Sequence, residues 1–369
     1  MSGRLARELL FVSAVLFAFF GFFLYQEAVR DAVKEALLLS ANALVPSLFP
    51  AMTISAFLIE SELFFPLSRL LDKPMRVFFR LPGAASLPVF LGFLAGYPVG
   101  ARTAASLYRK GVLSKSETER LLAFSNNSGP AFILGTVGFG LFSSREAGLA
   151  LLFAHLSAGL LLGLLFSLYK RKEPLSPPVA LTRSRPSLPA AFTGAVRSSS
   201  LSLLSVTGFV VFFSAAVRVL SECRLLPRAA LFASRFFPLT ASVLESFLAG
   251  LFEMTGGLAG LSPAGAGRLP LAAFLLGWAG LSVHFQVLSF LGECRLSVGP
   301  YLLGKFLHGL LSALLVPLFS SLLFSPARET AVPAGAAPVS GLSLSLAAAC
   351  PLLLLSFCCL VRERRKKSF

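Results

Sequence analysis

GFLAGYPVGA at residues 92–101 and SNNSGP at residues 125–130 interrupt the first apolar half of this chain. LFEMTGG at residues 251–257 and GWAGLSVHFQ at residues 277–286 interrupt the second half at matching places. Backbone that leaves a helix inside a bilayer has to be buried in protein or line a cavity, because lipid cannot satisfy its N–H and C=O groups. Paired breaks in two halves of a chain indicate a transporter binding site near the midplane of the membrane.

The composition is that of an integral membrane protein. Of the 369 residues, 56% are hydrophobic and 14% are charged, whereas about a quarter of the residues in a soluble domain are charged. The net charge of +16 does not indicate nucleic acid binding, because the basic residues lie between apolar runs and at the ends. There they orient the chain and attract anionic lipid headgroups. The five cysteines form neither a zinc motif nor a disulfide framework, and no metal or cofactor is expected.

Apolar stretches of roughly the 17 to 25 residues that cross a bilayer as a helix recur along the chain. They lie near residues 9–25, 38–59, 119–142, 147–169, 200–220, 270–291, 299–324 and 341–361. Segments 84–108 and 240–264 are apolar but broken by glycine, and we expect each to form a re-entrant helical hairpin. The sequence therefore predicts an all-α polytopic membrane protein with about eight transmembrane helices and two re-entrant hairpins.

The two halves are expected to be inverted repeats, because each contains three crossings and one hairpin in the same order. The predicted divisions are an N-terminal transmembrane anchor (1–35), a first repeat (36–169) and a cytoplasmic basic Pro/Ser-rich linker (170–197). They are followed by a second repeat (198–324) and by a C-terminal transmembrane helix with a basic tail (325–369). With the N-terminus inside, 23 of the 33 Lys and Arg residues lie on the cytoplasmic side, as the positive-inside rule requires. They lie at the N-terminus, in residues 69–120, in the linker 170–197, at Arg295 and in the C-terminal tail. The four arginines between 218 and 235 are the exception, and an interfacial helix is expected there.

The first break is expected at Pro130, which lacks a backbone N–H and clashes with the carbonyl of Asn126. Asn126, Asn127 and Ser128 lie beside this break, where their side chains would either satisfy freed backbone groups or contact a ligand. Two adjacent asparagines exceed what a kink requires, so we interpret the three residues as substrate-binding. The half-helix that follows would point its positive N-terminus at an anion.

The tip of the first hairpin is expected at Tyr97-Pro98. Gly92, Gly96 and Gly100 are spaced four apart, a pattern that close helix packing explains as well as a binding turn does. Tyr97 and Gly100 are assigned to the substrate site, together with Arg102 and Thr103, which follow the tip. A cationic side chain there suits an anionic substrate, although Arg102 would also reach the cytoplasmic interface.

In the second half, Glu253 is an acidic residue in apolar surroundings, which makes it a functional-site hypothesis by default. It would bind a proton or a cation, pair with Arg102 across the repeats, or face water at the hairpin tip. Thr255 follows it and is also assigned to the site.

Ser282, His284 and Gln286 are the counterpart of the asparagine break and complete the predicted substrate site. His284 would take part in proton coupling or serve as a hydrogen-bonded structural histidine. For His155 and His308, which occupy equivalent apolar helices, we expect helix-to-helix hydrogen bonds. Lys305 is expected to snorkel toward the cytoplasm.

An enzyme is not expected, because the sequence contains no nucleophile-and-base arrangement, P-loop or paired carboxylate site, and its three histidines are far apart. An intramembrane hydrolase remains as a minor alternative.

These same motifs resemble those of the sporulation integral membrane proteins of the YlbJ type, which carry the nucleoside-recognition, or Gate, domain. The resemblance rests on GYPVGA at 96–101, SNNSGP at 125–130 with GTVG at 135–138, EMT at 253–255 and GLSVHFQ at 280–286, and it covers roughly residues 36–324. It implies two Gate-like repeats in a multi-pass protein of the cell membrane, and transport of dipicolinate across the mother-cell-derived outer forespore membrane.

The chain is therefore interpreted as a carrier of a small anionic metabolite that also contacts membrane lipid. A nucleoside or other small-solute permease is the alternative within transport, and a structural component of a sporulation membrane complex is the alternative outside it. A coupling ion, either proton or sodium, and a homo-oligomer are left open by the sequence.

Overall fold

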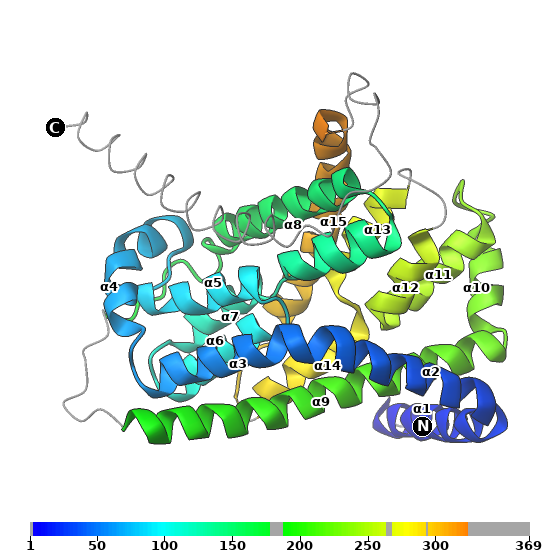
Figure 1. The fold of residues 1–369 in the computed structure, drawn as a ribbon, viewed down its shortest axis with the longest axis horizontal. Helices are drawn as coiled ribbons and strands as arrows, with labels where there is room; N and C mark the ends of the chain where they lie inside the picture. The colour runs from blue at the N-terminus through cyan, green and yellow to red at the C-terminus, as the bar shows by residue number, and fades with distance from the viewer. Residues whose placement is uncertain (1–2, 178–186, 263–267, 293, 324–369) are drawn as a thin grey trace, which may run out of the picture.

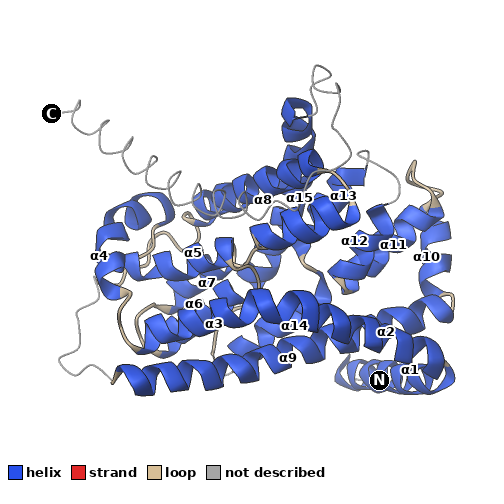
Figure 2. Ribbon diagram, viewed as in Figure 1, coloured by secondary structure: helices blue, strands red, loops and turns tan. Residues whose placement is uncertain are grey.

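The computed structural model describes residues 3–177, 187–262, 268–292 and 294–323, and every regular element within these ranges is helical (Figure 2). In the first half these are α1 (Gly3–Leu24), α2 (Gln26–Leu39), η1 (Ser40–Leu44), α3 (Val45–Glu60), α4 (Phe65–Pro74), η2 (Met75–Phe79), η3 (Gly83–Ala85), α5 (Ser86–Leu94), α6 (Val99–Arg109), α7 (Lys115–Leu122), η4 (Phe132–Leu141) and α8 (Arg145–Phe166). In the second half they are α9 (Leu188–Glu222), α10 (Leu225–Ala233), α11 (Ala241–Phe252), α12 (Met254–Leu261), α13 (Leu269–Trp278), α14 (Gly280–Leu291) and α15 (Gly299–Leu323).

Within the described residues, five helices are long and apolar enough to cross a membrane: Gln26–Glu60, Arg145–Phe166, Leu188–Glu222, Leu269–Leu291 and Gly299–Leu323. They confirm five of the predicted spans. A sixth candidate is the pair Ser68–Phe79 and Gly83–Leu94, which is bent by 90° and is either a broken span or a re-entrant loop.

Three of the expected spans have other outcomes. Residues 9–24 are helical within α1, which runs from Gly3 to Leu24, and among the described residues the apolar part of this helix is Val15–Leu24. The expected span 119–142 is broken before Pro130, as that proline predicts, and it is not among the candidate spans: α7 ends at Leu122, residues 123–129 are not helical, and the π-helix η4 begins at Phe132. The stretch 341–361 lies outside the described residues.

The long helices pack in two groups (Figure 1). α2 and α3 pack along α9, while α8 packs along α15 and α13 lies against both of them. Each group contains helices from both halves of the chain, so the two halves contact each other along their length. The short helix α4 lies at one end of α9 and α10 at the other (Figure 1), and α10 occupies the arginine-rich stretch where an interfacial helix was expected.

The described elements follow the same order in both halves. A long helix (α3 or α9) is followed by two short helices that pack together (α5 with α6, or α11 with α12), then by a broken helix and a closing long helix (α8 or α15). Two hydrophobic clusters form the core, and Tyr97 packs against both of them. The tip between α5 and α6 therefore lies between the two hydrophobic clusters.

Candidate functional site

The two helices of the first predicted hairpin close around the backbone of the first break. α5 ends before Gly96, which has φ +88°, and α6 begins after the cis peptide Tyr97-Pro98. A Cβ atom on Gly92 or Gly100 would lie within 2 Å of the carbonyl oxygen of Ser125. Gly100 therefore serves close packing, and this packing brings the hairpin tip and residues 123–129 together.

The unwound segment after α7 buries four consecutive polar residues, and each of them is at most 1% exposed. Asn127 donates from Nδ2 to the carbonyl of Phe124 at 3.0 Å. The Ser125 hydroxyl, both polar atoms of the Asn126 side chain and Oδ1 of Asn127 have no hydrogen-bond partner among the described residues. Buried polar groups are rarely left unpaired, so these atoms are available to hydrogen-bond with water or with a polar ligand.

Lys305 supplies the charge at this segment, contrary to the expectation that it snorkels. Its side chain lies on α15, is 1% exposed, and donates from Nζ to the backbone carbonyl of Asn126 at 2.7 Å. The ammonium also lies 5.4 Å from the centre of the Tyr97 ring. The ion pairs of the described residues do not include Lys305. An isolated buried charge is costly, so this ammonium favours an anion beside it.

Tyr97 connects the first hairpin tip to both halves of the molecule. Its hydroxyl lies 2.5 Å from Oγ of Ser128 in the first break and 2.8 Å from Sδ of Met254 at the start of α12. It also lies 3.3 Å from the carbonyl oxygen of Leu276 on α13. The predicted hairpin tips and the first break therefore meet at one side chain.

The stacked rings of two histidines lie next to the first break. The His155 and His308 rings lie 4.2 Å apart, and Nε2 of His308 lies 2.9 Å from the backbone carbonyl of His155, to which it donates. This confirms the expected helix-to-helix hydrogen bond. The backbone N–H of Ser128 donates to Nε2 of His155 at 3.0 Å. Because an amide can only donate, this nitrogen carries no proton and the His155 ring is neutral. The contact with the break was not expected from the sequence.

In the second half, Glu253 joins the two helices of the predicted hairpin. It has an extended backbone between α11 and α12, is 8% exposed, and accepts hydrogen bonds from the N–H groups of Thr255 at 3.0 Å and Gly256 at 2.8 Å. A carboxylate at this position caps the helix and interacts favourably with its dipole. Thr255 contributes through its backbone N–H. None of the ion pairs among the described residues joins Glu253 to Arg102.

The second break lies at Ala279 and Gly280, which both have left-handed backbone angles (φ 78° and 80°). A Cβ on Gly280 would approach the carbonyl oxygen of Phe252 to 3.1 Å, so this break lies against the second hairpin tip. After it, Nδ1 of His284 lies 2.9 Å from the Tyr301 hydroxyl, while its Nε2 has no partner among the described residues.

Ser282 and Gln286 lie beside His284 on the same helix. Both are buried, and Nε2 of Gln286 donates to Oγ of Ser282 at 3.3 Å. Tyr301 is fully buried on α15, one turn before Lys305. It therefore links the second break to the helix that carries the ammonium.

Arg102 and Thr103 are directed toward α3 and α9. Arg102 donates to the carbonyl of Met52 at 3.1 Å and to Oγ of Ser198 at 3.0 Å, and Thr103 lies 3.3 Å from Oγ of Ser55. None of these hydrogen bonds reaches either break. The structure thus brings Tyr97, Asn126, Asn127 and Ser128 together with Lys305, whereas the contacts of Arg102 lie elsewhere.

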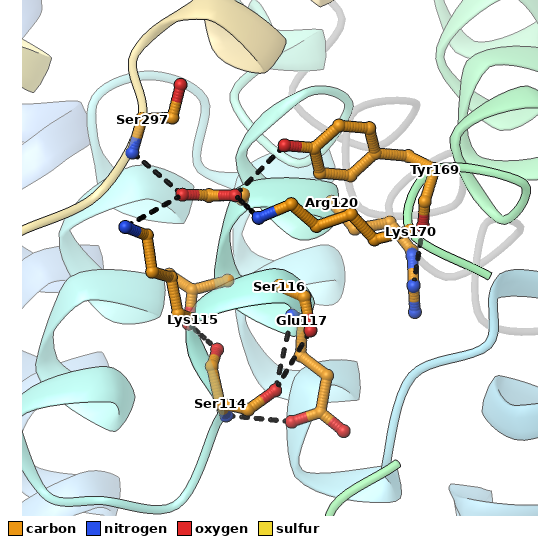
Figure 3. A network of polar contacts seen from close by, with 10 residues as sticks. Ser114, Lys115, Ser116, Glu117, Arg120, Tyr169, Lys170 and Ser297 are labelled. Atoms are coloured by element: carbon orange, nitrogen blue, oxygen red, sulfur yellow. Dashed lines mark hydrogen bonds and ion pairs between the residues drawn. The ribbon is translucent and has the colours of Figure 1, made fainter. Parts of the chain in front are cut away.

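A second polar cluster holds the start of the broken helix (Figure 3). The fully buried carboxylate of Glu119 on α7 accepts hydrogen bonds from Lys170 Nζ at 2.8 Å, the Tyr169 hydroxyl at 3.0 Å and the backbone N–H of Ser297 at 2.8 Å. Burial alone would raise the pKa of Glu119, but its hydrogen bonds to Lys170, Ser297 and Tyr169 lower the pKa overall. These segments belong to the ends that the sequence predicts to be cytoplasmic.

We expect Glu119→Gln to reduce the free energy of unfolding by about 2 kcal/mol at neutral pH, the value of hydrogen bonds to a charged group. Because the folded state lowers the Glu119 pKa, this stabilisation is present above the ordinary carboxyl pKa and is lost as the pH falls through the folded pKa. Melting curves of detergent-purified protein should therefore separate wild type from variant at pH 7 and draw together as the pH falls below the ordinary carboxyl pKa of about 4.3. The exposed Glu173, replaced by Gln, is the control; equal melting of wild type and Glu119→Gln at pH 7 would show that the cluster does not stabilise the fold.

Comparison with known proteins identifies the family. A family model described as nucleoside recognition, the Gate domain, matches residues 42–172. The sporulation integral membrane protein YlbJ of Bacillus subtilis (strain 168) is 32% identical over 338 residues, which cover 83% of each chain. The chain belongs to the YlbJ family of sporulation integral membrane proteins. No solved structure matches the chain.

Sequence reasoning missed Lys305, Tyr301 and Glu119 as members of polar clusters. A lysine in an apolar span with no acidic residue near it is a signal that could have identified Lys305, because such a charge needs a partner from elsewhere. Glu119 lay inside a predicted span, so its charge was a signal against that span. Tyr301 has no comparable signal, since a tyrosine near the start of an apolar helix is common at membrane interfaces.

Proposed function

We propose that this YlbJ-family chain is a membrane carrier of a small dicarboxylate, with the substrate held between the hairpin tips and the two breaks. The observation that supports it best is the buried ammonium of Lys305, which contacts the unwound segment at Asn126 and has no acidic partner in an ion pair of the described residues. A carboxylate of the substrate would neutralise this charge. In a low-dielectric site such a pairing is much stronger than in water.

The roles of the remaining residues follow from their unpaired atoms. The Ser125 hydroxyl, the Nδ2 group of Asn126 and the second N–H of Asn127 Nδ2 would donate to the carboxylate oxygens, and Nε2 of His284 would contact the other side of the substrate. Tyr97 would provide an aromatic face, and Ser128 would position the Tyr97 hydroxyl. Glu253 with Thr255, and Ser282 with Gln286, would hold the second hairpin and second break in place.

In this proposal the two halves are inverted repeats, with hairpins that enter from opposite sides, and transport proceeds by movement of one repeat against the other. The same order of elements in both halves supports it. Dipicolinate is the proposed substrate and the outer forespore membrane the proposed site of action, because a small aromatic dicarboxylate fits the charge and the chain belongs to a sporulation family. A coupling proton or sodium ion, and assembly into a homo-oligomer, remain compatible with it.

A nucleoside permease is the second candidate, and the match to a nucleoside-recognition model favours it. Proteoliposomes that contain the purified chain separate the two. We expect saturable uptake of labelled dipicolinate that excess unlabelled dipicolinate abolishes and excess uridine leaves unchanged. Uptake of uridine with no uptake of dipicolinate would replace the first proposal by the second, and uptake of neither would overturn both.

A further inference from the structure

A polar pocket, separate from the two breaks, lies where α3, α6, α9 and α14 meet. Its volume is about 200 Å³, which is below the range of about 300–1,000 Å³ that is usual for sites that enclose a whole small molecule. It is lined by Ala56, Ile59, Glu60, Arg102, Ser106, Arg109, Ser198, Ser202 and Phe290. The size suits a single anionic group rather than a complete metabolite.

Two arginines give this pocket its charge. Arg102 is 7% exposed and uses two of its guanidinium N–H groups on Met52 and Ser198. Arg109 is exposed, and it donates to the carbonyl of Phe290 at 3.0 Å and to Oγ of Ser106 at 3.5 Å. A guanidinium carries five N–H donors, so both side chains keep donors for a ligand.

Neither arginine forms an ion pair with an acidic side chain in the described part of the chain. Glu60 is the carboxylate that lines the pocket, and its ion pair is with Lys110 at 3.4 Å. Two guanidinium groups beside serine hydroxyls form a set of donors that matches a tetrahedral oxyanion, because arginine binds phosphate through parallel hydrogen bonds.

The position of the pocket indicates which anions can reach it. Arg102 and Arg109 belong to residues 69–120, Phe290 lies just before Arg295, and Ser198 lies just after the linker 170–197; the sequence predicts these stretches to be cytoplasmic. Ser198 and Arg109 are exposed while Arg102 is buried, so the pocket leads from the surface to a buried charge. Basic pockets between transmembrane helices on the cytoplasmic side bind anionic lipid headgroups.

We propose that this pocket binds a phosphate group through Arg102 and Arg109. The source is either the headgroup of an anionic phospholipid or free phosphate, and both offer the same oxygens to the two arginines. Ile59 and Phe290 provide apolar walls beside the site, which would contact the glycerol and upper acyl chain of a lipid. The site is independent of the proposed substrate site, because its hydrogen bonds do not involve Lys305 or the breaks.

The test is equilibrium binding to the full chain purified in detergent, with two probes. One is a short-chain phosphatidylglycerol and the other is inorganic phosphate. In Arg109→Gln we expect the dissociation constant of the bound probe to rise about tenfold, which is the loss expected for a hydrogen bond between charged groups. In Arg102→Gln we expect the dissociation constant to rise by at least as much. Lys172→Gln removes an exposed charge from the same predicted side and should leave binding unchanged.

The outcomes separate the sources. Binding of phosphatidylglycerol alone assigns the site to a lipid headgroup, and competitive binding of inorganic phosphate assigns it to a free anion. Failure of both probes to bind, or equal binding by wild type and both arginine variants, overturns the proposal. Arg109→Gln keeps the test valid if Arg102→Gln does not fold, because the Arg109 side chain is exposed. Transport is not measured, so failure here leaves the carrier proposal untouched.

Discussion

Replacing Lys305 with methionine is expected to abolish dicarboxylate uptake into proteoliposomes and to leave the melting temperature unchanged or higher. Truncation of one partner of a desolvated charge pair costs about 2–5 kcal/mol, which corresponds to a loss of substrate affinity of at least about 30-fold. Methionine is unbranched and fills irregular space, and replacement of a buried charge by an apolar side chain of similar size is often neutral or stabilising.

The combination of these two readouts separates a substrate-binding role from a structural one. If Lys305 only anchors the Asn126 carbonyl, Lys305→Met should lose stability and its remaining folded fraction should transport normally. Lys172→Met, at an exposed position, is the matched control for loss of a lysine. Normal uptake by a stable Lys305→Met protein would exclude Lys305 from the substrate site.

The double variant Asn126→Ala with Asn127→Ala has the second largest expected effect: loss of uptake in a protein that still folds. The Asn126 side chain makes no hydrogen bond of normal geometry within the described residues, so its removal should cost little stability. Asn127 loses one hydrogen bond, to Phe124, at a cost of about 1 kcal/mol. Proteoliposome uptake and melting temperature are the measurements.

Asn42 provides the control for this variant, because it is the remaining asparagine of the chain and is exposed on η1. Asn42→Ala should transport as wild type does. Unchanged uptake in the double variant would remove the asparagines from the substrate site, and a fall in stability well beyond that of one hydrogen bond would assign them a structural role instead.

The breaks were predictable because their cause is local. Pro130 cannot continue a helix and Gly280 adopts a left-handed backbone angle, and the structure departs from helix just before Pro130 and at Gly280. The long spans were predictable for a similar reason, since their apolar length can be counted. The apolar count that began the broken span at residue 119 passed over Glu119 and Arg120, whose charges belong to the polar cluster on α7.

The position of Lys305 was not predictable, because it depends on a contact between distant segments. A Cβ on Gly304 would lie 2.2 Å from the carbonyl oxygen of Ala123, so α15 lies directly against the start of the unwound segment. This contact encloses Lys305, which a linear sequence places near the end of a span where snorkelling is usual. The partners of Arg102 and the capping role of Glu253 likewise depend on packing that periodicity does not reveal.

The most direct test of the account is equilibrium binding of labelled dipicolinate to the purified full-length protein and to Lys305→Met. The account predicts saturable binding by wild type that Asn42→Ala retains and that Lys305→Met weakens by at least about 30-fold. Equal binding by wild type and Lys305→Met would contradict the claim that the buried ammonium holds the substrate.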